Sequence, residues 1–171
     1  MRKTWCLVWA ALLALMFGSS CALAEIASGT CGEHLTWVLA DDGTLTISGS
    51  GAMTDWDSSG TAWSDYRDSL VKVVIEEGVS SIGQHAFTMD TALKEVRIAA
   101  SVESIGIQAF SYCSALSSVT GASGVKTINK DAFVSCSNLT AYPFAQGLQS
   151  IGATAFNLSG LLSASLPDRF S

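Results

Sequence analysis

The sequence has 171 residues, of which 49% are hydrophobic and 14% are charged, whereas about 25% are charged in typical soluble domains. This hydrophobic content excludes a disordered tail. Nine Lys and Arg residues against fifteen Asp and Glu residues give a net charge of −6, so an extended phosphate backbone would be repelled and we expect no nucleic-acid partner. Five cysteines are too few for a disulfide-dense miniprotein, and we expect one ordinary domain.

Residues 1–24 have the pattern of a secretory signal peptide. Arg2 and Lys3 precede an apolar run that ends at Phe17, and an A-x-A cleavage site ends at Ala24. The apolar run is shorter than the ~20 residues that a membrane span requires. A lipoprotein anchored through Cys21 is the alternative. We expect cleavage before residue 25, export of the remaining chain, and no membrane span after cleavage.

Residues 25–69 are expected to form an N-terminal cap built on a β-hairpin. Leu35, Trp37 and Leu39 alternate with outward positions, and a turn at 41–43 leads to a second alternating segment. The apolar end of a repeat array must be covered, and the bulky side chains of this segment are suited to that. These side chains are Trp56, Trp63 and Tyr66. A tryptophan platform that stacks on sugars is the alternative reading.

From residue 70 onward the sequence repeats every 23 residues. The pattern places hydrophobic residues at the same point of every repeat: Leu93, Val96 and Ile98 upstream, Ile82, Ile105, Ile128 and Ile151 in the middle, and Phe87, Phe110, Phe133 and Phe156 downstream. A single coil cannot bury these side chains, so coils must stack. The period predicts a leucine-rich-repeat solenoid over 70–171, with one β-strand and an irregular or short helical return per coil. We expect four coils, the fourth strand carrying Thr140, Ala141 and Pro143 outward, and a partial fifth coil from Leu161.

A glycine follows the isoleucine in three of the coils, as Gly83, Gly106 and Gly152, and Asn129 takes this place in the remaining one. Glycine and asparagine are the residues that best tolerate a positive φ. The pattern therefore predicts a tight corner with positive φ after each isoleucine.

No motif for catalysis, a cofactor or a metal is found in the sequence. His34 precedes the hairpin, and His85 occupies a position that varies between coils, so neither is expected to be catalytic. The acids Asp41, Asp42, Asp55 and Asp57 do not have calcium-loop spacing and are expected to be solvated turn residues. Cys113 and Cys136 occupy the same position one coil apart; we favour a ladder of buried free thiols over a disulfide, with Cys31 also free.

The repeats resemble the BspA-like leucine-rich repeats, whose coils read roughly L-x-x-V-x-I-P-x-x-V-x-S-I-G-x-x-A-F-x-x-C. The resemblance extends from Leu70 to the C-terminus. It implies a non-enzymatic exported or cell-surface protein that binds other proteins, on host or neighbouring-cell surfaces.

In a solenoid the outward residues of the strands form the binding surface. The candidate contact residues are Lys72, Val74, Lys94, Glu95, Arg97, Ser118 and Thr120. Two alternatives stay open: a carbohydrate-binding module that uses the tryptophans, and a truncated gene product without independent function. The predicted fifth coil stops before its Ile-Gly corner, and we expect either self-association through that edge or fraying back to about residue 160.

Overall fold

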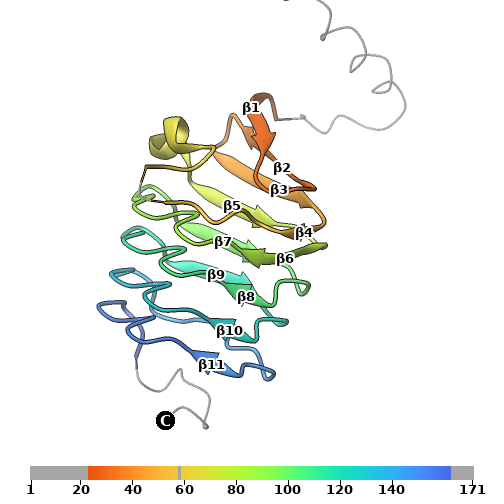
Figure 1. Ribbon diagram of the computed structural model, residues 1–171. Coiled ribbons are helices and arrows are strands. Elements are labelled where there is room, and N and C mark those ends of the chain that lie inside the picture. Colours follow the sequence, from red (N-terminus) through yellow and green to blue (C-terminus); the bar gives the residue numbers. More distant parts are fainter. Residues whose placement is uncertain (1–22, 58, 163–171) are drawn as a thin grey trace, which may run out of the picture.

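The structure is a computed structural model that describes residues 23–57 and 59–162 (Figure 1). Most of the predicted signal peptide lies outside the described residues. The same holds for the predicted fifth-coil positions Ala164, Leu166 and Phe170 and for the edge expected to self-associate. These predictions stay open.

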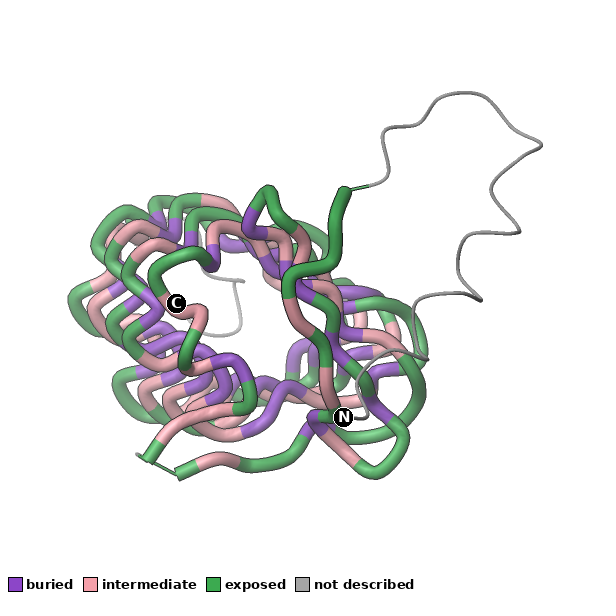
Figure 2. The backbone as a smooth tube through the Cα atoms, turned by 90° about the horizontal axis from the view of Figure 1, so that it is seen from above, coloured by how far each residue is buried: buried purple, intermediate pink, exposed green. Residues whose placement is uncertain are grey.

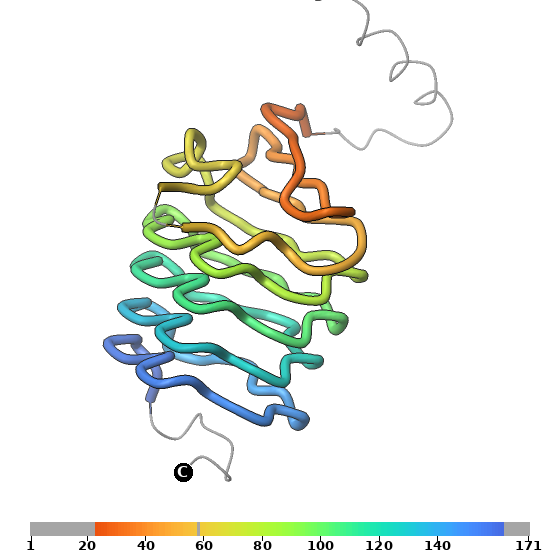
Figure 3. The backbone as a smooth tube through the Cα atoms, viewed as in Figure 1, coloured from red at the N-terminus to blue at the C-terminus, as the bar shows by residue number. Residues whose placement is uncertain are grey.

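The described chain forms a β-solenoid whose coils stack along one axis, so the predicted leucine-rich-repeat solenoid is confirmed (Figures 2 and 3). Each regular coil has a strand in a first sheet: β5 (Lys72–Ile75), β7 (Glu95–Ile98) and β9 (Ser118–Gly121). These strands pair in parallel, and each residue lies opposite the one that stands one repeat later in the sequence: Lys72 opposite Glu95, and Glu95 opposite Ser118.

The return of each coil is mostly irregular, as predicted, but it also contains a short second strand that was not predicted. β4 (Gly51–Ala52), β6 (Val79–Ile82), β8 (Ser104–Ile105), β10 (Thr127–Ile128) and β11 (Ser150–Ile151) form a second parallel sheet. These strands are short and obtain their hydrogen bonds from the coils above and below. Among the residues described, the helical segment is the 3₁₀ helix η1 (Ser64–Ser69).

The core consists of columns of identical side chains between the two sheets. Phe87, Phe110, Phe133 and Phe156 stack with their ring centroids 5.1 Å apart, which is the coil-to-coil step. Trp63 extends this stack, with its ring 5.1 Å from that of Phe87. Trp63 of the N-terminal segment thus packs against the first regular coil.

The N-terminal region contains the predicted antiparallel hairpin, β2 (Leu35–Ala40) and β3 (Thr44–Gly49), and a strand that was not predicted, β1 (Glu25–Thr30). β3 pairs in parallel with β5, with Leu45 opposite Val73, and β4 pairs with β6. Residues 44–52 therefore occupy both strand positions of a coil. The offset to the next coil is longer than 23 residues, which hides this coil from a periodicity search.

The explanation of the Ile-Gly corner by positive φ is wrong. The left-handed residues lie two positions later, at His85, Gln108, Asp131 and Thr154, with φ between 54° and 58°. The glycines are needed because consecutive coils approach closely: a Cβ on Gly106 would lie 2.6 Å from the backbone nitrogen of Gln84. Asn129 instead donates a hydrogen bond from Nδ2 to the carbonyl of Ile105, at 2.8 Å.

The strand expected in the fourth coil is absent from the first sheet of the described chain, which ends at β9. Pro143 has no N–H to donate to a strand ladder. The backbone instead makes a tight turn in which the Phe144 N–H bonds the carbonyl of Tyr142 at 3.0 Å. Tyr142 remains buried in the core, so this coil keeps its packing without the strand.

Candidate functional site

The predicted contact residues lie on the outer face of the first sheet. Residues of alternate parity point inward, and Val73, Val96 and Val119 are buried there. Two outward rows cross β5, β7 and β9: Lys72, Glu95 and Ser118 form one, and Val74, Arg97 and Thr120 form the other. Glu95, Arg97 and Thr120 are exposed, and Lys72, Val74 and Ser118 are half-buried.

Five of the seven predicted residues line one shallow depression of about 80 Å³, which we call the sheet depression. They are Lys72, Glu95, Arg97, Ser118 and Thr120, around the buried Val96. Val74 lies beside the depression in the row of Arg97. Lys94 is exposed but precedes β7, so it does not share the alternation of Glu95 and Arg97.

The charges of the sheet depression are open to solvent. Lys72 Nζ lies 3.3 Å from Glu95 Oε2, and both side chains are about half exposed, so this ion pair contributes little to stability. Glu77 accepts the backbone N–H of Ala100, at 2.9 Å; this bond and the charge of Arg97 lower the pKa of Glu77. The surface runs from charged side chains on β5 and β7 to neutral hydroxyls on β9.

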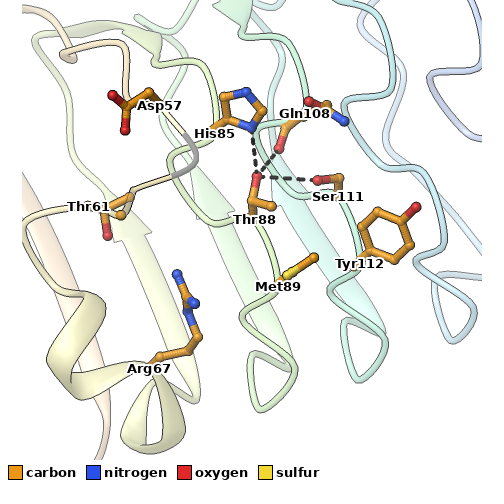
Figure 4. A pocket seen from close by; sticks show the side chains of 10 residues that line it. Asp57, Thr61, Arg67, His85, Thr88, Met89, Gln108, Ser111 and Tyr112 are labelled. Atoms are coloured by element: carbon orange, nitrogen blue, oxygen red, sulfur yellow. Dashed lines mark hydrogen bonds between the residues drawn. The ribbon is translucent and has the colours of Figure 1, made fainter.

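A larger pocket of about 270 Å³ lies where the chain turns after each Ala-Phe pair; we call it the turn pocket (Figure 4). Its lining includes Asp57, Arg67, His85, Met89, Gln108 and Tyr112. His85 Nδ1 lies 3.4 Å from the hydroxyl of Thr88, which donates to the carbonyl of Gln108 at 2.7 Å. The sequence analysis missed this pocket.

Asp90 lies behind the turn pocket and is almost completely buried. It accepts a hydrogen bond from Arg67 Nε at 2.8 Å. Burial raises the pKa of Asp90 to about 6, although the charge of Arg67 opposes this shift. The sequence contains a signal for this residue. Asp90 occupies the repeat position at which the next two coils have Cys113 and Cys136, so a charged residue replaces a core cysteine.

The tryptophans do not form an open platform. Trp37 and Trp63 are buried, and Trp56 packs its ring edge-on against Trp63, with centroids 5.8 Å apart. The rings required for sugar stacking on this segment are thus part of the packed N-terminal core.

The three cysteines of the described chain are free and buried, as predicted. Cys113 Sγ donates to the carbonyl of Phe87 at 3.0 Å, and Cys136 Sγ donates to that of Phe110 at 3.1 Å. Burial raises the pKa of Cys31 to about 11 and that of Cys136 to about 12, and it also raises the pKa of Cys113 above its ordinary value. These thiols stay protonated and unreactive at neutral pH.

Two of the four acids considered for calcium serve as turn residues: Asp42 and Asp57 accept the backbone N–H groups of Thr44 and Ser59, each at 2.8 Å. Asp55 instead accepts the backbone N–H of Gln84 in the next coil, at 2.7 Å. Within residues 23–57 and 59–162, no three His, Cys, Asp or Glu side chains gather as metal ligands do. No helix in the same ranges is both long and apolar enough to cross a membrane.

The stacked coils, their parallel sheets and the outward rows define a leucine-rich-repeat protein of the solenoid class. The BspA-type leucine-rich repeat region matches residues 62–171 in six copies, and the chain belongs to this family. The match begins before Leu70, at the segment that contains Trp63. No curated protein matches the chain in sequence.

Solved structures of bacterial leucine-rich repeat proteins are similar to this chain. One from Eubacterium ventriosum is 33% identical, with a TM-score of 0.69; the match covers 79% of this chain and 37% of that one. One from Bacteroides capillosus is 27% identical over 78% of this chain and 94% of its own, with a TM-score of 0.51. The protein from T. pallidum, 24% identical over 77% of this chain and 68% of its own with a TM-score of 0.55, shows the fold alone.

Proposed function

We propose that this chain is an exported or cell-surface protein that binds another protein through the outer face of its first sheet, without catalysis. The observation that carries the proposal is the sheet depression, in which Lys72, Glu95, Arg97, Ser118 and Thr120 come together from three neighbouring strands. The solenoid holds β5 and β7 by strand pairing on both sides, and it holds β9 by pairing with β7. The family membership supports an interaction role. A shared fold does not by itself establish a function, so the proposal rests on the residues of the sheet depression.

The character of the surface favours a polar partner segment of mixed charge. Lys72, Glu95 and Arg97 offer both signs within two strands, and the hydroxyls of Ser118 and Thr120 offer donors and acceptors without charge. Complementary charges at such a surface contribute mainly to specificity and to the rate of association.

A random peptide library displayed on phage tests this assignment, because binders selected on an intact protein collect at its preferred recognition surface. We expect the selected peptides to lose at least about tenfold in affinity when Glu95→Lys and Arg97→Glu are combined. The matched control combines Glu103→Lys and Lys126→Glu, which reverses an ion pair outside the depression. Peptides that respond to the control and ignore the first variant would place recognition elsewhere.

Export is tested separately. A bacterium that expresses the full chain should release or display a protein whose N-terminal residue is Glu25. Retention of Met1 in the exported fraction would contradict the cleavage, and a lipid-modified Cys21 would support the lipoprotein alternative.

A further inference from the structure

The turn pocket is supported from behind by polar groups that the core does not otherwise contain. Asp90 and Ser111 are the buried polar residues of the described chain; Ser111 belongs to the pocket lining, and Asp90 lies next to it through its bond to the lining residue Arg67. Asp90 holds Arg67, and Ser111 Oγ donates to Thr88 Oγ1 at 3.2 Å. Burying a polar group costs stability unless the group is hydrogen-bonded or paired, and here the partners, Arg67 and Thr88, are residues that line the pocket.

The front of the pocket combines two kinds of side chain. Figure 4 shows Arg67, His85 and Asp57 on one side and Met89 and Tyr112 on the other. Met89 and Tyr112 are 53% and 48% exposed, so they contribute an apolar and an aromatic surface that the core does not use. Asp57 is held by Ser59, whose hydrogen bonds lower the pKa of this carboxyl, so it is an ionised acceptor at neutral pH.

We propose that the turn pocket binds a neutral pyranose, either a free hexose or the terminal residue of a glycan. The guanidinium of Arg67 and the carboxylate of Asp57 are a donor and an acceptor for ring hydroxyls, and Tyr112 offers an aromatic face to the C–H side of the ring. The volume of about 270 Å³ accommodates one such ring rather than a long chain.

The local charge argues against an anionic ligand. Arg67 is already neutralised by Asp90, and Asp57 adds a further negative charge at the pocket. The whole chain carries a net charge of −6. A carboxylated or sulfated sugar would therefore be repelled, whereas a neutral ligand with many hydroxyls meets both donors and acceptors.

The test is a titration followed by NMR of the backbone amides, with methyl glycosides of glucose, galactose and mannose, each added alone. We expect at least one glycoside to bind in the millimolar range and to shift the amides of His85 and Gln108. Tyr112→Ala and Asp57→Asn should each weaken this binding about tenfold. Leu158→Ala is the matched control: Leu158 has a positive φ and an exposed side chain like Tyr112, stands two repeats later in the sequence, and should leave binding unchanged when replaced.

Asp90→Cys tests whether Asp90 positions Arg67 in the pocket. It replaces the carboxylate with the cysteine that the next two coils have at this position, as Cys113 and Cys136. It should weaken glycoside binding while the amide spectrum of the rest of the chain stays that of a folded protein. The proposal is overturned if none of the glycosides binds at tens of millimolar, if Tyr112→Ala and Asp57→Asn both bind like the unaltered chain, or if zwitterionic L-methionine binds more tightly than every glycoside.

Discussion

Replacing Phe110 by alanine should remove the centre of the aromatic column. Its side chain is fully buried and stacks on Phe87 and Phe133, at 5.1 Å on either side and within 9° of parallel. Loss of a packed core aromatic costs about 3–5 kcal/mol, and each aromatic pair adds ~0.5–1.5 kcal/mol beyond its buried area. Because both pairs are lost and the coils above and below hold the cavity open, we expect a loss near 5 kcal/mol.

Phe156 gives the comparison within the same column. It stacks on Phe133 on one side, is only partly buried, and touches Tyr142 and Phe144 edge-on. We therefore expect Phe156→Ala to cost about 2–3 kcal/mol. Urea titration followed by circular dichroism measures both losses, with Ile107→Ala, at 40% exposure, as a control that should change little. Equal losses for Phe110→Ala and Phe156→Ala would refute the stacked-column account.

Four further outcomes follow from the packing of the coils. Asp90 has a pKa of about 6 against an ordinary 3.8, so the folded state binds its proton more tightly, and stability should fall by about 3 kcal/mol as the pH rises from about 3 to about 7. Asp90→Cys should flatten that decline and raise stability at pH 7 by about 1–3 kcal/mol, and destabilisation of this variant at pH 7 would contradict the assignment. Gly106→Ala should clearly lower the urea midpoint, because the new Cβ would meet the backbone of the preceding coil. Gly147→Ala is the control and should leave the midpoint unchanged, because Gly147 has open space around it. Similar midpoints for the two variants would disprove the close approach of the coils. In a chain that begins at Glu25, Ellman's reagent should detect three thiols after denaturation and almost none before it, and a count of one would reveal a disulfide.

Asp90 connects the stability of the fold with the turn pocket. The repeat pattern places a cysteine at this point in the next two coils, where its thiol donates to a backbone carbonyl and needs no partner charge. Asp90 instead leaves Oδ2 buried without a hydrogen bond. We therefore expect Asp90→Cys to raise stability and to weaken glycoside binding. Both effects have the same cause, because the buried carboxylate costs stability and holds a residue of the pocket.

The repeat made much of this protein predictable from its sequence. A period of 23 residues fixes which side chains face the core, because every coil must present the same apolar positions to its neighbours. The columns of Phe110 and Ile105, the buried thiols of Cys113 and Cys136, and the outward rows of the first sheet all follow from that rule. Alternation alone was also sufficient for the hairpin of β2 and β3.

Other features were decided by the tertiary structure, because they depend on what a neighbouring coil supplies. A strand as short as Ser104–Ile105 has too little sequence to be recognised and exists through its bonds to β6 and β10. The coil of β3 and β4 has an irregular length, so no period reveals that Trp63 joins the phenylalanine column. The turn pocket joins residues as distant as Asp57 and Tyr112, and the buried Asp90 is paired with Arg67 from the preceding coil. Such residues come together because neighbouring coils are stacked along the solenoid axis. The spacing of residues within a single repeat does not predict these contacts between coils.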